Sequence, residues 1–210
     1  MSRKVNPFGF RVGVTKDWRS RWYAEGDLYA DALIEDDKIR KYLKRELRSA
    51  GIESLIIERS IKSVKVIIKV AKPGIVIGRK GVGLSKLREY LSKTTSAELD
   101  LQIEEVQKPE SQSNIIADSI AMQIERRVSP RRAMNIAADK ALEAGVKGIK
   151  IQVGGTVYGP NSIAVVQSVA RGAVPTQTLR ADIDFSKSTA STRGGTIGVK
   201  VWVYHGEIGE

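Results

Sequence analysis

Cysteine is absent from this sequence of 210 residues, and histidine occurs once, at His205. Without cysteine the chain has no disulfide, no cysteine-ligated zinc or iron–sulfur cluster, and no thiol nucleophile. A single imidazole excludes a histidine-based catalytic triad or a multi-histidine metal site within one chain. Aromatic residues make up 6% of the sequence, which limits base stacking as a main binding mode. These absences exclude most histidine- and cysteine-based chemistry before any motif is considered.

Long apolar runs are missing as well, because lysine interrupts the longest apolar stretches, so no segment is expected to span a membrane. Residues 1–14 contain Arg3, Lys4 and Arg11 but no apolar core, so we expect no secretory signal. The lack of cysteine fits a reducing compartment, and we expect the protein to be cytoplasmic. A hydrophobic content of 41% is sufficient to build real cores, in one or two domains.

The charge is strongly positive, with 35 Lys and Arg against 24 Asp and Glu and a formal net charge of +11. Such an excess on a folded protein is typical of polyanion binding, which releases counterions. The alternative is a charge spread evenly for solubility. The cations are instead grouped, at 19–21, 38–48, 79–80 and 126–132, in predicted loops, turns or polar helix faces. We therefore expect a surface that binds phosphate groups.

The first half of the chain predicts an arm followed by a small α+β domain. Residues 1–26 have no hydrophobic period and contain Pro7, Gly9 and Gly13, so they predict an extended N-terminal arm. The patterns that follow predict a helix at 28–50, strands at 52–59 and 64–70, a short apolar helix-like segment at 75–77, a helix through Leu84–Leu91 and a strand at 99–103. We assign 27–108 to this domain.

The second half predicts another α+β domain, at 109–210, after a junction near Lys108–Ser111. A helix with isoleucine every fourth residue ends near Val128, and Ser129-Pro130 is a cap followed by proline that begins a second, alanine-rich helix. Strand patterns follow at 149–153, 163–170, 179–185 and 197–204. Two helices and several strands predict a mainly antiparallel or mixed sheet.

The strongest local motif is Gly78-Arg79-Lys80-Gly81, between the short apolar segment and an amphipathic helix. Two glycines three apart let the backbone approach a phosphate, and the two central cations add charge at the contact. A GXXG loop of this kind clamps single-stranded nucleic acid in KH domains, and the order of elements at 27–108 resembles the prokaryotic (type II) KH arrangement. The alternative is a plain helix–turn–helix corner. A Rossmann fingerprint and a P-loop do not fit the glycine spacing.

The second motif is a dense group of arginines, Arg126, Arg127, Arg131 and Arg132, around a predicted helix–helix corner. These cations repel one another unless an anion lies close, so we interpret them as contacts to an RNA backbone. The alternative is a solvated corner with incidental ion pairs, for example to Glu125.

Two further groups of residues have competing interpretations. Trp18 and Trp22 alternate with Arg19 and Arg21, where the tryptophans either stack on bases or, as we prefer, anchor the arm on its own domain. Asp182 and Asp184 share one face of a predicted strand and are candidate ligands of a divalent metal. We prefer a solvated or salt-bridged strand face, because no third ligand is evident.

Together these segments resemble the family of the bacterial small-subunit ribosomal protein three over almost the whole chain. The residues that carry the resemblance are Lys4–Arg11, Ser20–Ala24, Pro73–Gly81, Glu125–Ser129, Arg131–Met134, Lys147–Val153, Thr178–Asp184 and Gly198–Trp202. The resemblance implies a place in the head of the small subunit, with contacts to small-subunit rRNA and to neighbouring proteins of the tenth and fourteenth types. It also implies that the protein lines the channel through which mRNA enters, grips mRNA and helps to melt its hairpins.

The mRNA-gripping positions of the family correspond to Arg131 and Arg132, whereas a third basic position is Asn135 here. The stretch Gly154–Val166 also departs from the family, which has an arginine and further charged residues there. We expect no cofactor, no bound metal and no enzymatic activity. The residues expected to bind RNA are Gly78, Arg79, Lys80, Gly81, Arg126, Arg127, Arg131, Arg132, Lys4, Arg11, Arg19 and Arg21. The competing hypotheses are a free-standing KH regulator of RNA and a metal-dependent nuclease using Asp182 and Asp184.

Overall fold

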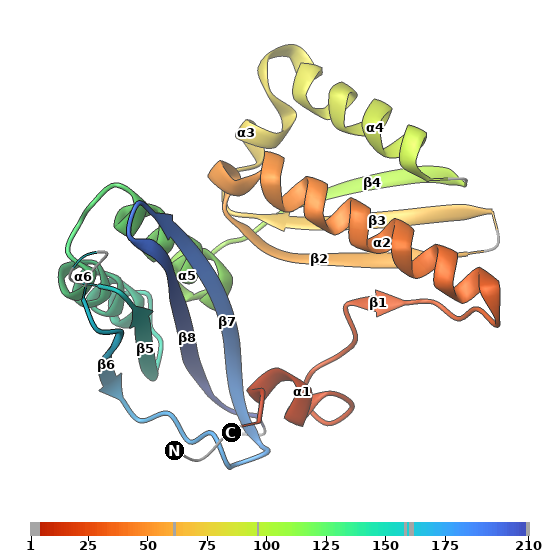
Figure 1. Cartoon of the computed structure of the whole chain (residues 1–210). Coiled ribbons are helices and arrows are strands. Elements are labelled where there is room, and N and C mark those ends of the chain that lie inside the picture. The colour runs from red at the N-terminus through yellow and green to blue at the C-terminus, as the bar shows by residue number, and fades with distance from the viewer. Residues whose placement is uncertain (1–4, 61, 96, 158, 160–161, 209–210) are drawn as a thin grey trace. The chain divides into compact units, whose positions relative to one another are not determined.

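The computed structural model describes residues 5–60, 62–95, 97–157, 159 and 162–208. The described residues form two compact units, of which one is Trp18–Gln107. The other comprises Lys108–Glu210 together with the described part of Met1–Asp17 (Figure 1). Within the described ranges, no helix has the length and apolar character that crossing a membrane requires.

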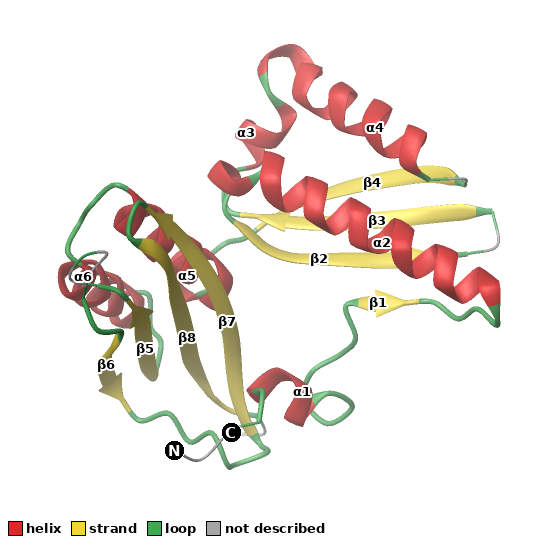
Figure 2. Ribbon diagram, in the orientation of Figure 1, coloured by secondary structure: helices red, strands yellow, loops and turns green. Residues whose placement is uncertain are grey.

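The unit Trp18–Gln107 packs helices against one face of a four-stranded sheet (Figure 2). Its described helices and strands are β1 (Ser20–Arg21), α2 (Asp27–Glu46), β2 (Ile52–Arg59), β3 (Ser63–Val70), α3 (Pro73–Ile77), α4 (Val82–Thr94) and β4 (Glu98–Glu105). The strand order is β1-β2-β3-β4, with β2 and β3 antiparallel and the two outer pairs parallel. After β1, the elements follow the order predicted from the sequence and required by the type II KH resemblance.

The core of this unit lies between the sheet and the helices. In β3 every second side chain is buried, from Val64 to Val70, because successive residues of a strand point to opposite faces. Leu43 of α2 and Leu91 of α4 are fully buried against them. The lysines of β3 lie on the opposite, partly exposed face, so the apolar face of the strand is buried and the other face carries charge.

The second unit is a four-stranded antiparallel sheet with two long helices. Its described helices and strands are α1 (Pro7–Arg11), α5 (Ser113–Glu125), α6 (Pro130–Glu143), β5 (Gly148–Gly155), β6 (Val165–Gly172), β7 (Ala181–Thr192) and β8 (Gly195–Glu207), in the sheet order β6-β5-β8-β7. Ala133, Ala138 and Ala141 are fully buried on α6. These small side chains let α6 lie close to its neighbours, and the expected α+β fold is confirmed.

The N-terminal residues do not form one extended arm. Pro7–Arg11 is helical, because the Asn6 side chain accepts a hydrogen bond from the backbone N of Phe8 at 2.9 Å and Pro7 occupies the first helical position. This helix packs on β7, whereas Ser20 and Arg21 pair with β2 of the other unit. The prediction of an extended arm is therefore wrong for α1, and its two ends belong to different units.

Arg11 fixes α1 to the second unit. Its side chain is fully buried, and its Nε donates to the carbonyl oxygen of Ala181 at 2.8 Å. One terminal nitrogen donates to the carbonyl of Pro7 at 3.1 Å, and the other donates to Thr176 at 3.1 Å and to Thr178 at 2.7 Å. A guanidinium with no exposed surface has no room for a phosphate. Arg11, which the sequence led us to expect at the RNA interface, is instead a structural residue.

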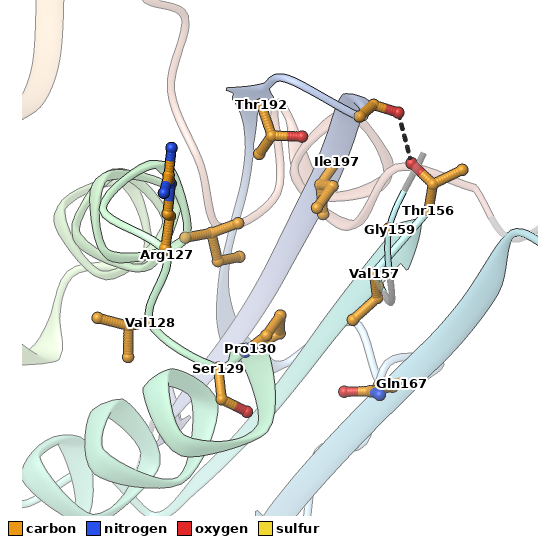
Figure 3. Close-up of a pocket in the computed structure, with 12 residues that line it drawn as sticks. Arg127, Val128, Ser129, Pro130, Thr156, Val157, Gly159, Gln167, Thr192 and Ile197 are labelled. Carbon is orange, nitrogen blue, oxygen red and sulfur yellow. Dashed lines mark hydrogen bonds between the residues drawn. The ribbon is translucent and has the colours of Figure 1, made fainter. Parts of the chain in front are cut away.

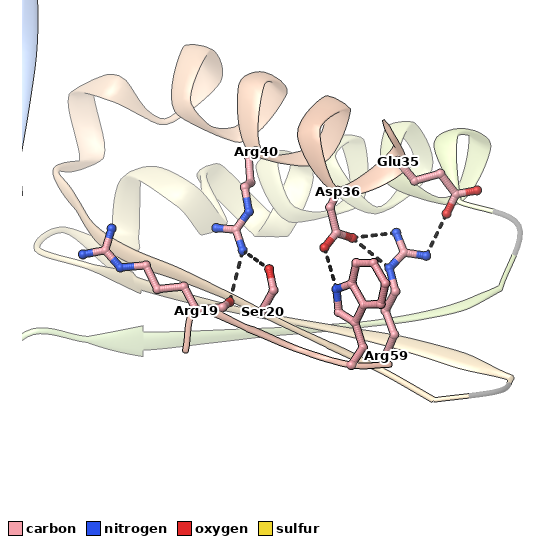
Figure 4. Close-up of polar contacts among 7 residues, drawn as sticks. Arg19, Ser20, Glu35, Asp36, Arg40 and Arg59 are labelled. Carbon is pink, nitrogen blue, oxygen red and sulfur yellow. Dashed lines mark hydrogen bonds and ion pairs between the residues drawn. The ribbon is translucent and has the colours of Figure 1, made fainter. Parts of the chain in front are cut away.

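The anchoring role expected of the tryptophans holds for Trp22. Its Nε1 donates to Oδ2 of Asp36 on α2 at 2.9 Å. Oδ1 of Asp36 accepts from Nε of Arg59 at 2.8 Å, and Nη1 of Arg59 donates to Glu35 at 2.9 Å (Figure 4). Asp36 is 3% exposed, and the cation of Arg59 balances its charge in an ion pair of 2.6 Å. Trp18, by contrast, is 66% exposed.

Arg40 holds the same segment from the helix side. One terminal nitrogen donates to the carbonyl of Leu55 on β2 at 2.8 Å. The other donates to the carbonyl of Arg19 at 3.1 Å and to Oγ of Ser20 (Figure 4). Burial lowers the pKa of Arg40, and the charge of Asp36 opposes that effect. This cation of the cluster at 38–48 therefore faces inward and holds β1 beside β2.

We predict that Arg11→Ala lowers the free energy of unfolding by about 3 kcal/mol, because four carbonyl oxygens lose a charged donor and a cavity remains. Urea denaturation measures the change. The control is Arg193→Ala, which removes an exposed arginine at the turn between β7 and β8 and should change stability by less than about 0.5 kcal/mol. Equal effects of the two substitutions would contradict the structural role of Arg11.

Candidate nucleic-acid interface

The GXXG loop joins α3 to α4 and exposes both of its cations. Gly78 and Gly81 have φ angles of +70° and +78°, which favour glycine. Lys80 also has a positive φ, of 54°, so the backbone turns sharply at the loop centre. Arg79 and Lys80 are exposed, and neither forms an ion pair or side-chain hydrogen bond with a described residue. The loop therefore presents two free charges on a tight backbone.

A third glycine, Gly83, was missed by sequence reasoning. A Cβ at this position would lie 2.6 Å from the carbonyl oxygen of Val76 and 3.0 Å from that of Ile77. The first turn of α4 thus lies directly against the end of α3, and only glycine leaves room for this approach. Gly78, Gly81 and Gly83 form the pattern GxxGxG in the sequence. This pattern excludes a Rossmann fingerprint, but by itself it does not show that Gly83 touches α3.

The arginine corner, defined as Arg126–Arg132, connects α5 to α6 in the second unit. Its four arginines are exposed, and none forms an ion pair with a residue that the structure describes. Glu125, considered above as their incidental partner, accepts a hydrogen bond from the backbone N of Ser191 at 3.1 Å. Four unpaired guanidinium groups in so short a stretch create a local positive potential that attracts a polyanion.

The backbone of the corner is held in an unusual conformation. Arg127 has a φ of 63°, in the left-handed region that costs a non-glycine residue about 1–2 kcal/mol. Its N donates to the carbonyl of Ile124 at 2.9 Å, and the N of Val128 donates to Gln123 at 3.0 Å, which closes the end of α5. Ser129 and Pro130 occupy the predicted cap and first position of α6, although the Ser129 side chain makes no capping bond.

The remaining candidates are dispersed. Arg21 is exposed and forms an ion pair with Glu58 at 3.2 Å, and Arg19 lies at the end of the segment held by Arg40. Lys4 lies outside the described residues. The predicted residues therefore include two local groups, the loop in one unit and the arginine corner in the other, and Arg11 belongs to neither.

The two strand carboxylates have structural partners. Asp182 forms an ion pair with Lys16 at 2.6 Å, and Asp184 accepts from the backbone N of Ser113, in the first turn of α5, at 3.0 Å. Among the described residues, no group of three or more potential metal ligands comes together. The salt-bridged interpretation of this strand face is the one the structure supports.

Comparison with known families assigns both units. A KH domain model matches residues 38–111, which contain the GXXG loop. The model of the ribosomal protein S3 C-terminal domain matches residues 120–203, which contain the arginine corner. Small ribosomal subunit protein uS3 of Persephonella marina is 48% identical over 208 residues, covering 99% of this chain and 91% of that protein. The chain belongs to the uS3 family.

Other uS3 proteins are similarly close. Those of Lachnoclostridium phytofermentans and Koribacter versatilis are 48% and 49% identical over 208 residues, covering 99% of this chain and 94% and 92% of theirs. The resemblance drawn from the sequence is thus confirmed, as are the KH domain and the α+β C-terminal domain. uS3 proteins are structural, RNA-binding proteins of translation and not enzymes, and this chain is one of them.

We predict that Gly83→Ala lowers the free energy of unfolding of the KH domain by about 2 kcal/mol, because the added methyl group collides with backbone rather than with a movable side chain. Gly81→Ala is the matched control: it has open space around its Cβ and should lose only about 1 kcal/mol, from its positive φ. Hydrogen exchange of the β3 amides reports the difference. A larger loss for Gly81→Ala would contradict the contact between α3 and α4.

Proposed function

We propose that this uS3 protein is a structural constituent of the head of the cytoplasmic small ribosomal subunit, where it binds rRNA and lines the channel through which mRNA enters. The arginine corner is the observation that carries the proposal, because its four exposed cations have no ion-pair partner among the described residues. An RNA backbone supplies closely spaced anions and relieves their mutual repulsion. Contacts to ribosomal proteins of the tenth and fourteenth types, implied by the family resemblance, belong to the same proposal.

The two exposed cationic sites have separate roles in this proposal. Gly78–Gly81 clamps rRNA, as the GXXG loops of KH domains clamp the nucleic-acid backbone. Arg131 and Arg132, in the first turn of α6, bind phosphates of incoming mRNA. Each such contact favours single-stranded mRNA over the hairpin at this point, so the melted state gains stability without covalent chemistry. Unwinding is then a consequence of differential binding.

Asn135 sets the strength of this grip. It lies four residues after Arg131 on the uninterrupted helix α6, so both side chains share one helix face. The family resemblance implies a basic residue at this position, whereas the amide of Asn135 carries no charge to attract a phosphate. We infer that this protein holds mRNA with one cation fewer on that face.

The competing functions lack comparable support. A free-standing KH regulator needs no second domain, whereas the similarity to uS3 proteins extends over 99% of the chain. Sucrose-gradient fractionation of cell extract separates the alternatives. We expect the protein to sediment with small subunits, and sedimentation only with free proteins at the top of the gradient would overturn the ribosomal proposal.

We predict that Arg131→Ala/Arg132→Ala leaves subunit assembly intact but slows translation through a stable mRNA hairpin. For the isolated protein, the slope of log K against log salt for single-stranded RNA should become shallower by about 1.4, from roughly 0.7 per phosphate contact. The matched control is Lys187→Ala/Lys200→Ala, which removes two exposed cations of β7 and β8 in the same domain. Unchanged hairpin transit in the corner variant would refute the mRNA assignment.

We predict the opposite effect for Asn135→Lys, which restores a cation one helical turn after Arg131. Ribosomes carrying it should pass the same hairpin faster than wild type, as measured by single-round translation kinetics. Leu142→Lys adds the same charge farther along α6, at an exposed position, and should have no effect. A gain from both substitutions would indicate general electrostatics rather than a contact at the N-terminal end of α6.

A further inference from the structure

A cleft of about 420 Å³ opens beside the arginine corner, inside the second unit. Its lining comes from the end of α5, the corner, the start of α6, the segment after β5, β6 and the turn between β7 and β8. Figure 3 shows Arg127 on one side of the cleft and Thr156 and Val157 on the other. Its volume lies in the range of small-ligand sites, about 300–1,000 Å³.

The walls of the cleft are mainly apolar, from side chains that also border the domain core. The apolar lining residues are Ile124, Val128, Pro130, Val157 and Ile197. Oγ1 of Thr156 donates to the carbonyl of Gly194 at 2.9 Å and ties the segment after β5 to the turn between β7 and β8 (Figure 3). Oγ1 of Thr192 donates to the carbonyl of Gly195 at 2.7 Å. These bonds fix the position of the wall opposite Arg127.

The charge of the cleft has one sign. Among the described residues that line it, Arg127 is the single charged side chain, and no carboxylate accompanies it. Its left-handed backbone holds the residue beside the cleft, and its guanidinium has no ion pair with a described residue. The cleft therefore fits a ligand that combines an apolar body with an anion a few bonds away.

We propose that the cleft binds one unpaired nucleotide, with its base between the apolar walls and its phosphate on Arg127. A nucleobase is planar and apolar on its faces, and unpaired bases of RNA are commonly splayed out and held in protein pockets. The inference rests on the proposed function, because the other arginines of the corner would guide the flanking phosphates. An RNA strand and a free mononucleotide offer the same chemistry.

The test follows methyl resonances of Val157 and Ile197 by NMR in the full chain. The probes are hexauridine, hexaadenosine, an abasic hexamer, AMP, UMP and ribose 5-phosphate. A base in the cleft shifts these resonances upfield through its ring current, whereas ribose 5-phosphate and the abasic hexamer do not. Shifts with the hexamers alone identify an RNA strand as the source, and shifts with the mononucleotides alone identify a free nucleotide. Absence of any base-dependent shift overturns the proposal.

Two variants locate the effect. Val157→Phe fills the cleft and should weaken hexamer binding about tenfold, comparable to the loss of one stacked base. Val166→Phe makes the same change at a residue that is 65% exposed on β6 and outside the cleft lining, and should leave binding unchanged. If Arg131→Ala/Arg132→Ala loses RNA while Val157→Phe binds normally, the pocket is refuted and the proposed function stands. If the arginine variant binds RNA normally, the proposed function fails. The methyl shifts of the wild-type protein with mononucleotides then show whether the cleft binds a nucleotide.

Discussion

A guanidinium that leaves water needs acceptors for its N–H donors, and much of this structure depends on where three arginines find them. Arg11 uses backbone carbonyls beside β7, Arg40 uses carbonyls of β2 and of the preceding segment, and Arg59 uses the carboxylates of α2. These bonds fix the two ends of the N-terminal stretch, each to its own unit. The donors of these three arginines are occupied inside the protein. The arginines of the corner, in contrast, form no ion pair with a described residue.

The free cations are presented by two different backbone solutions. In the GXXG loop, Gly78 and Gly81 flank Lys80 and all three residues have positive φ angles, so the chain turns tightly enough for a phosphate to reach the backbone. In the arginine corner, Arg127 itself adopts the left-handed conformation, so the residue that turns the chain also carries charge. Strain of this kind persists where the surrounding structure imposes it, and it is common at functional sites. Both solutions leave cations without an ion-pair partner in the part of the chain that the structure describes, as binding to a polyanion requires.

Much of the fold follows from the sequence, because periodicity reports the side of an element that is buried. Alternation in β3 and the four-residue spacing of α2 identified their inner faces, and Ser129-Pro130 located the start of α6. No local pattern shows whether an arginine in an irregular segment is buried or exposed. Arg11 and Arg131 are chemically the same, but three of the four acceptors of Arg11 lie 165–170 residues away along the chain. Gly83 was missed for a related reason, since its importance depends on α3 packing against α4.

The long sequence separation within the Arg11 cluster also orders the folding of a growing chain. Synthesis proceeds from the N-terminus, and domains generally fold as units once they are complete. Residues 18–107 can therefore form the KH domain while the acceptors of Arg11, near β7, have not yet been made. Until then α1 has no site on which to pack, and its cation remains hydrated. α1, which is synthesised before the KH domain, thus reaches its final position only after β7 of the second domain has been made.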